Sequence, residues 1–531
     1  MRTIPLTVIE SVTCKKNWHT KIQNKEIRDK WRAEMTDSAI STDNAMSGPI
    51  HPTVLEWAFD ELLHLAGTVC KANGIAPTTA PYVYQSDSLI SAHLCSQLKQ
   101  CVRALENFTD DALDYHPGTN KQVLDLIHPS LFCLISNLSR VVPEPLPFRP
   151  HSAWLQILGK GEVYEIPMPD QRGSEYATHS DTYQWLPSDI TVGADGQSVS
   201  FDSYINNLHP YEHEGLYTCL EAILGRFIPM FERVLTDLRT PLARRDDAPE
   251  TDELYGEFVY DGDGDSEDER YDDWYENRVP KIKEEMKKFD ATKRHAVSAE
   301  TLSLAGRKLQ VIVKMANVRL EGPGAAFDGG HWHVEGMENE HIVSIGIYYY
   351  DVHPGLGESR LHFRQPTCEP EYEQGDTQGV EAVYGLVDEE ALVQDVGAVT
   401  TMEDRCIAFP NVLQHKVPGF TWKEGYTPNE GEVGERKILV FFLVDPTQRV
   451  ISTGVVPPQQ REWMSSAMKD MSELTQHFPP EIVEQIGNKL EWPLSLAQAK
   501  EHREKLMHER KYFTDASTEQ YFERPFSLCE H

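Results

Sequence analysis

Two histidines and one glutamate in this chain have the residue types and the spacing of a metal site. His333 and Glu335 are separated by one residue within the segment 329–336, and His415 follows much later in the chain. Side chains at positions i and i+2 of an extended strand point to the same face, and a histidine on a second strand can complete a three-ligand corner. Two imidazoles and one carboxylate on one side of an ion form the facial triad of non-heme Fe(II) sites. We therefore expect these three residues to bind one metal ion.

A second ligand set is open within the same segment. His331 shares the strand parity of His333, and Glu338 lies shortly beyond them. Together with His415, these residues would give a site of three histidines and one glutamate, as in cupin-type metalloenzymes. The two sets make different predictions, because Glu335→Ala abolishes metal binding in the first set and Glu338→Ala abolishes it in the second.

The candidate ligands lie in a part of the chain that is rich in strand signals. Short runs of β-branched and aromatic residues, bounded by glycine and proline, are typical of strands. These runs cover residues 309–318, 342–350, 398–400, 406–409 and 438–444. We therefore expect a β-rich core to position the ligands.

Helical patterns precede and follow this core. Apolar residues recur at the three- and four-residue spacing of a helix within residues 55–66, 94–105, 216–234 and 464–474. His209-Pro210 puts a proline at a plausible first position of the third of these helices. Residues 154–158 have a shorter, more extended pattern, and the apolar run 123–138 lies in a region that we expect to be mostly helical.

These patterns divide the chain into five regions. They are a mainly helical region (1–150), a mixed region ending in a long helix (151–240), an acidic insertion or linker (241–298), the β-rich core (299–456) and a helical tail (457–531). The acidic run 261–269 within the insertion lacks the glycine and the final glutamate of an EF-hand loop, so we expect a solvated loop there.

Charge and cysteine content limit the partners and the compartment. The chain has 531 residues, and its 84 acidic and 50 basic side chains give a formal net charge of −34. Such a surface repels phosphate backbones and anionic lipids, which argues against nucleic acid and membrane partners. The 9 cysteines form no C-x-x-C pair, and we find neither an apolar leader nor a run of about 20 apolar residues. We expect a cytoplasmic protein whose oligomeric state the sequence does not reveal.

Three segments near the candidate ligands carry a resemblance to a known class of enzymes. The pair Tyr348-Tyr349 ends the strand after the first two ligands, a D-R-x-x-x-F segment at 404–409 precedes the distal histidine, and Arg436 begins the next strand. Residues 315–446 thus resemble the double-stranded β-helix core of Fe(II)/2-oxoglutarate oxygenases, most closely the prolyl-hydroxylase type. The resemblance implies an α+β fold in which this jelly-roll core is flanked by extensive helical segments.

The same resemblance implies roles for individual residues. His333, Glu335 and His415 would bind Fe(II). Arg436 would grip the distal carboxylate of the cosubstrate 2-oxoglutarate, and Tyr349 would hydrogen-bond the same group. A cation at the mouth of an apolar strand needs an anion, and the planar fork of arginine suits a carboxylate. The implied activity is hydroxylation of a small molecule or of a protein side chain.

Two departures from the pattern leave alternatives open. The acidic ligand is Glu335 rather than the commoner aspartate, and the insertion 416–435 leaves open whether Arg436 or Lys437 binds the cosubstrate. A non-catalytic binding protein that keeps the fold but has lost turnover is a further alternative.

The whole chain also resembles the fungal DUF4246 family. The matching segments are 115–131, 185–187, 203–210 and 332–337. They cover widely separated parts of the chain, but the family name supplies no activity.

Overall fold

The computed structural model describes most of the chain. The described residues are 3–37, 50, 52–107, 113–166, 179–240, 255–256, 258–260, 267–278, 288–291, 301–370, 372, 376–471, 474, 476–490 and 492–528. Most of the expected acidic insertion, including the run 261–266, lies outside these residues. The described part is a mixed helix-and-sheet structure whose strands pair in antiparallel sheets.

A nine-stranded antiparallel sheet forms the centre of the molecule. Its order is β1 (Ala76–Pro77), β2 (Tyr84–Ser86), β15 (Cys406–Pro410), β12 (Ile342–Val352), β18 (Val433–Val444), β10 (Lys308–Glu321), β8 (Ser188–Val192) and β9 (Val199–Phe201), and β3 (Val123–Ile127) also pairs with β10. The strands expected at β10, β12, β15 and β18 are confirmed. Their β-branched side chains favour this structure because they pack well on a pleated surface.

Two smaller antiparallel sheets carry the segments next to the candidate ligands. One is β14 (Val393–Thr400), β13 (Arg360–Pro366) and β16 (Gln414–Lys416), and the other is β11 (Ala326–Gly329) with β17 (Pro418–Thr421). One buried cluster joins the main sheet to the three-stranded sheet, and we call it the inter-sheet core. Its members include Ile345, Phe409 and Phe442 from the main sheet and Leu361, Phe363 and Val399 from the smaller sheet.

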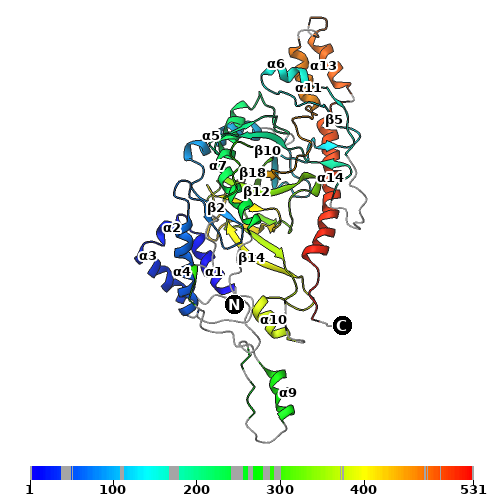
Figure 1. Cartoon of the computed structure of the whole chain (residues 1–531). Coiled ribbons are helices and arrows are strands. Elements are labelled where there is room, and N and C mark those ends of the chain that lie inside the picture. Colours follow the sequence, from blue (N-terminus) through cyan, green and yellow to red (C-terminus); the bar gives the residue numbers. More distant parts are fainter. Residues whose placement is uncertain are drawn as a thin grey trace.

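Helices cover the opposite face of the main sheet. α5 (Ala92–Glu106) and α7 (Glu214–Arg239) lie beside β12, as Figure 1 shows, and the buried cluster under them is the helix-side core. Successive residues of a strand point to opposite faces, so Phe441 belongs to the helix-side core and Phe442 to the inter-sheet core. Gly346 allows the close approach of α7, because an added Cβ would lie 2.7 Å from the ring of Phe227.

Further helices pack at the two ends of the molecule. α1 (Thr3–Thr13), α2 (Trp18–Lys21), α3 (Lys25–Asp37) and α4 (Pro52–Thr68) share a separate hydrophobic cluster. In the tail, α14 (Leu496–Ser517) contributes Leu506 to the inter-sheet core, and α13 (Pro480–Asn488) packs on α11 (Arg461–Asp470). The helices expected within residues 55–66 and 94–105 are confirmed as α4 and α5.

The remaining described elements are short. They are β4 (Leu134–Ile135) paired with β7 (Tyr183–Gln184), β5 (Arg140–Val141) paired with β6 (Glu162–Val163), α6 (His151–Ile157), α9 (Glu267–Asn277), α10 (Thr377–Tyr384), the 3-10 helix η3 (Glu338–Glu340) and the π-helix η4 (Thr518–Phe522).

Two local predictions about element type were wrong. Residues 154–158 belong mostly to α6 rather than to an extended segment, because the two buried side chains of this helix are three positions apart, on one helical face. The apolar run 123–138 contains the strands β3 and β4, so this part of the N-terminal region extends the sheets. Short apolar runs do not distinguish a buried helix from a buried strand.

Two helix boundaries also differ from expectation. α7 begins at Glu214 rather than at Pro210, because the preceding residues form a turn in which the ring of His209 accepts the backbone N–H of Tyr211. α11 ends at Asp470 and Met471 lies outside it, so the helix expected within residues 464–474 is interrupted there, although Leu474 is again helical.

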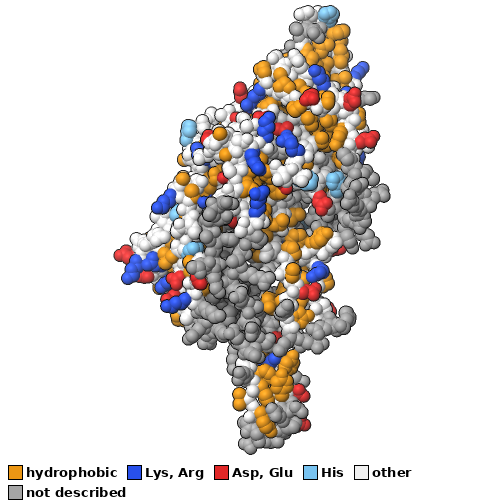
Figure 2. Space-filling view, viewed as in Figure 1, with side chains coloured by type: hydrophobic (Ala, Val, Ile, Leu, Met, Phe, Trp, Pro, Cys, Tyr) orange, Lys and Arg blue, Asp and Glu red, His pale blue; other side chains and the backbone are white. Residues whose placement is uncertain are grey.

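The surface view shows where apolar side chains remain exposed. In Figure 2 they gather at the end of the molecule that carries α11 and α13, where Phe478, Ile482 and Ile486 are exposed. Among the described helices, none combines the length and the apolar character that crossing a membrane requires.

Candidate metal centre

The three predicted ligands come together between the two smaller sheets. His415 lies on β16, and His333 lies shortly after β11. The two residues form an isolated antiparallel bridge, in which His415 N donates to His333 O at 3.0 Å and His333 N donates to His415 O at 3.3 Å. This bridge places the two imidazoles side by side, with ring centroids 4.3 Å apart.

The carboxylate of Glu335 faces both rings. Its Oε1 lies 3.7 Å from Nε2 of His333 and 3.6 Å from Nε2 of His415. Nδ1 of His333 is 2.8 Å from the carbonyl of His331, which can only accept a hydrogen bond. Neutral His333 therefore carries its proton on Nδ1 and presents the lone pair of Nε2 to the centre of the group, as a metal ligand requires.

Glu335 does not continue a regular strand after His333, as the i, i+2 spacing predicted. Its backbone bends, and Asn411 holds the bend from both sides: Glu335 N donates to Asn411 Oδ1 at 2.8 Å, and Asn411 Nδ2 donates to Glu335 O at 2.8 Å. Gly336 then adopts a φ of 72°, where an added Cβ would lie 2.7 Å from a carboxylate oxygen of Glu340. The bend, rather than strand parity, aims Glu335 at the histidines.

The alternative ligands lie elsewhere. His331 and Glu338 are exposed, and among the described residues neither joins the group formed by His333, Glu335 and His415, whose ligand atoms lie within 4.8 Å of one another. The structure therefore brings together the two-histidine, one-carboxylate set and not the set of three histidines.

The pKa values of the three candidate ligands are shifted in different directions. For Glu335, burial raises the pKa, but the hydrogen-bonding contacts with the two histidines outweigh it and hold the pKa well below its usual range. For His333, partial burial lowers the pKa, and the contact with Glu335 more than offsets it, so the pKa is raised. Burial and the neighbouring His333 lower the pKa of His415. The carboxylate is thus ionised beside imidazole nitrogens, a donor set that suits a divalent transition metal.

Arg436 is buried on the inter-sheet side of β18. Its side chain is 4% exposed, donates to the hydroxyls of Ser359 and Thr401, and stacks 4.3 Å from the ring centroid of Phe420. Among the described residues no carboxylate pairs with it, and its Nε has no hydrogen-bond partner. Burial lowers its pKa. Because an unpaired buried cation is costly, this guanidinium is suited to an anionic ligand.

Tyr349 lies in the inter-sheet core, on the same side of the sheet as Arg436. Burial raises the pKa of Tyr349 to about 12, although the charge of Arg436 lowers it, so the phenol is protonated and can donate. Lys437 points to the helix side instead, where its Nζ lies 2.7 Å from Oε1 of Glu106 and 3.2 Å from Oε2 of Glu435. Of the two cations left open by the sequence, Arg436 is the unpaired one on the inter-sheet side.

The sequence reasoning missed a buried carboxylate that holds the loop after the ligands. Glu340 is fully buried; it accepts the N–H of Met337 at 2.6 Å and the N–H of Trp185 at 2.7 Å, and it pairs with Arg510 of α14. Arg510 stacks on Trp185, 3.9 Å from the ring centroid. Glu340 therefore ties the ligand loop to α14.

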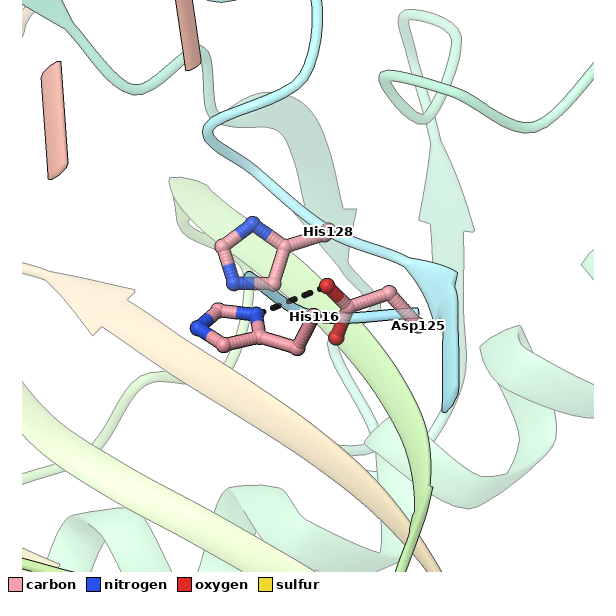
Figure 3. A group of neighbouring side chains, drawn as sticks. All are labelled: His116, Asp125 and His128. Carbon is pink, nitrogen blue, oxygen red and sulfur yellow. Dashed lines mark hydrogen bonds and ion pairs between the residues drawn. The ribbon is translucent and has the colours of Figure 1, made fainter. Parts of the chain in front are cut away.

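A second cluster of two histidines and one carboxylate was also missed. His116, Asp125 and His128, which Figure 3 shows, have ligand atoms within 4.8 Å of one another, and Nδ1 of His116 lies 2.8 Å from Oδ2 of Asp125. Both histidines precede proline, which predicted turn residues. The available signal was Asp125 itself, because a carboxylate inside an apolar strand is costly without a partner.

Comparison with known proteins defines the class and then the family. The chain is a mixed helix-and-sheet protein with a candidate metal centre of two histidines and one carboxylate. The family model of DUF4246, described as a protein of unknown function, matches residues 52–467. This is well over half of the chain, so the chain belongs to the DUF4246 family. No curated protein matches it.

Solved structures show distant similarity. A 2OG-Fe(II) oxygenase family oxidoreductase from Burkholderia pseudomallei is 10% identical, over 27% of this chain and 46% of its own, with a TM-score of 0.15. The chain thus spans about half the length of that protein. IDO from Bacillus thuringiensis is 7% identical (49% and 73%, TM-score 0.19), and a prolyl-4-hydroxylase from Pseudomonas putida is 9% identical (25% and 52%, TM-score 0.13). At these TM-scores, the similarity to these structures gives no information about function.

Proposed function

We propose that this protein is an Fe(II)/2-oxoglutarate-dependent oxygenase that hydroxylates its substrate. In this proposal, residues 299–456 form the catalytic core, and the main sheet and the smaller sheets are the two halves of a double-stranded β-helix. The observation that carries the proposal is Arg436: a buried guanidinium without a carboxylate partner, on the side of the main sheet that faces the ligand-bearing sheets.

The position of Phe420 links the two parts of the proposed site. Its ring stacks on Arg436, and its strand β17 pairs with β11, which ends just before His333. The guanidinium therefore lies against the strand pair that leads to the metal ligands. A dicarboxylate that reaches from the metal to Arg436 would satisfy both ends.

Each residue has a separate role in the proposed reaction. His333, Glu335 and His415 would hold Fe(II), which supplies, together with 2-oxoglutarate and O₂, the oxidation of a C–H bond. Arg436 would orient the distal carboxylate of 2-oxoglutarate, and Tyr349 would donate a hydrogen bond to it. Restraining the cosubstrate in this way lowers the entropic cost of reaction.

Two other functions give different results in the same experiment. The protein, purified without oxygen and loaded with Fe(II), is mixed with 2-oxoglutarate, and we expect a weak visible absorption band and, on admission of O₂, succinate. Glu335→Ala should abolish both signals, while Glu338→Ala, a change of an exposed neighbouring carboxylate, should leave both intact.

The outcomes separate the alternatives. Loss of iron in Glu338→Ala but not in Glu335→Ala would establish the cupin-type site. Iron binding with neither the band nor succinate, or no iron binding at all, would show a binding protein without this turnover.

A further inference from the structure

A polar pair on the inter-sheet side of the main sheet has no role in the proposed metal and cosubstrate sites. The pair is Lys314 on β10 and Asp125 on β3. We propose that Lys314 binds the carboxylate of a free α-amino acid and Asp125 binds its ammonium, which makes a free amino acid the substrate class. This inference rests on the proposed oxygenase function and names its substrate.

The nearest residues to Lys314 on its face of β10 are the apolar Ile312 and Ala316. It lies on a strand whose residues alternate between the two cores, and it shares the face of Ile312 in the inter-sheet core. Its side chain is half-buried. Among the described residues it makes neither a hydrogen bond nor an ion pair. A partly desolvated ammonium of this kind needs an anion.

Asp125 offers the complementary group. Its side chain is 1% exposed, and Oδ2 accepts the hydrogen bond from Nδ1 of His116, whereas Oδ1 is buried and has no hydrogen-bond partner among the described residues. Burial raises the pKa of Asp125, but His128, His116 and Lys314 outweigh it and lower the pKa to about 2. The carboxylate is therefore ionised with one oxygen unsatisfied, which a substrate ammonium would correct.

The placement of the two groups fits a zwitterion. Asp125 pairs across the strands with Ala316, two residues from Lys314 on the same face and beside a register shift between Met315 and Ala316. The two side chains are thus neighbours on adjacent strands, although no ion pair joins them. A ligand that satisfies both must carry a negative and a positive charge a few bonds apart, as an α-amino acid does.

The pair also lies on the face of the main sheet that carries the proposed cosubstrate residues. Ile312, beside Lys314 on this face, belongs to the inter-sheet core together with Tyr349 and Phe363, and Phe363 pairs across the strands with His415. An amino acid held by its head group would extend its side chain from there. His116, whose side chain is 22% exposed, connects the cluster to solvent.

A second metal ion is the competing use of this cluster, and the hydrogen bonds argue against it. Nδ1 of His128 accepts the backbone N–H of Ser130 at 3.2 Å, so neutral His128 carries its proton on Nε2. A histidine that binds a metal through Nε2 needs its proton on Nδ1 instead.

The test uses the whole protein loaded with Ni(II), a redox-inactive substitute, and saturated with 2-oxoglutarate. Calorimetric titrations with the common L-amino acids are compared with their N-acetyl and amide derivatives. We expect at least one free amino acid to bind, and loss of either charge to weaken binding by about tenfold or more. Asp125→Asn should remove the penalty for N-acetylation, and Lys314→Met should remove the penalty for amidation. Lys308→Met, a change of an exposed lysine on the same strand, is the matched control.

The results separate this inference from the proposed function. Binding of 2-oxoglutarate without binding of any free amino acid, or equal binding of the N-acetyl derivatives, would overturn the inference alone. No binding of 2-oxoglutarate would overturn the proposed function. If Lys314→Met and Asp125→Asn each lower the thermal unfolding temperature, the double variant restores it and no amino acid binds, the two residues only neutralise each other. Two Ni(II) ions per chain, reduced to one by His128→Ala, would establish a metal site instead.

Discussion

The His333 group (His333, Glu335, His415) and the His116 group (His116, Asp125, His128) contain the same three residue types at similar separations, yet their hydrogen bonds prepare them for different chemistry. In the His333 group, a backbone carbonyl takes the Nδ1 proton of His333, and its Nε2 lone pair faces the carboxylate. In the His116 group, a backbone N–H donates a hydrogen bond to Nδ1 of His128, and Nδ1 of His116 is hydrogen-bonded to Asp125.

The difference shows that the partner on the far nitrogen decides what an imidazole can bind. A carbonyl partner frees Nε2 for a metal, and an N–H partner removes that option. The two carboxylates also differ in their cationic neighbours. Arg503 lies near Asp125, whereas among the described residues no lysine or arginine forms an ion pair with Glu335.

The largest expected effect is on metal binding. His415→Ala removes a ligand and should weaken Fe(II) binding by more than about 100-fold, since loss of mere outer partners already costs about 10–100-fold. His128→Ala, the matched change in the His116 group, should leave one iron per chain. Metal analysis after dialysis measures both. Equal iron loss in the two variants would contradict the distinction between the groups.

Removal of the buried cation comes next. Arg436→Met should weaken 2-oxoglutarate binding by about 100-fold, because truncating one partner of a buried charge pair costs about 2–5 kcal/mol. Lys437→Met is the control, because Lys437 faces the helix side and pairs with Glu106. Calorimetry with the Ni(II)-loaded protein gives both affinities. A larger loss in the Lys437 variant would reassign the cosubstrate anchor.

A smaller effect concerns acid stability of the His116 group. Burial lowers the pKa of His128 from 6.5 to about 3, so between these values the unfolded chain binds more protons than the folded protein. Stability should therefore fall as the pH decreases from 6.5 towards 3, by about 1.4 kcal/mol per pH unit from this residue alone, and not change above 6.5. In His128→Asn, the amide oxygen can still accept from Ser130 and does not titrate.

Urea unfolding at several pH values measures this difference. Between pH 6.5 and 5, we expect the wild type to lose about 2 kcal/mol more than His128→Asn. Identical slopes in the two proteins would mean that the pKa of His128 is the same in the folded and unfolded states.

The smallest expected effect tests the bend at Glu335. Asn411→Ala removes the side chain that holds the Glu335 backbone from both sides and should weaken Fe(II) binding by about tenfold. Val412→Ala changes the exposed neighbour and serves as the control. If metal affinity is unchanged in the Asn411 variant, the bend does not need this support.

The central strands could be predicted from the sequence, and several local elements could not. Runs such as 309–318 and 438–444 are long enough and rich enough in β-branched residues to specify strands. By contrast, α6 and β3 are short apolar runs, whose type depends on the sheet or helix that they pack against. The start of α7 was missed because His209, not Pro210, organises the preceding turn.

The site residues differ in the same way in how clearly the sequence marks them. His333 and Glu335 were found because their spacing is a local sequence signal. His415 and Arg436 were found because the sequence segments around them are recognisable. Glu340 and Asn411 act through backbone contacts that only the folded loop creates. Lys314 and Asp125 could have been noticed in the sequence, because each is a charged residue inside a mostly apolar strand.

The contact between Glu340 and Arg510 joins residues 170 positions apart. During synthesis at about 5–20 residues per second, the ribosome needs roughly 10–30 s to make that intervening chain. Throughout this time the loop that carries His333 and Glu335 is outside or leaving the exit tunnel without the helix that fastens it. The contact that fastens the ligand loop to α14 therefore forms late in synthesis, and premature termination before α14 would release a nascent chain whose ligand loop lacks this contact.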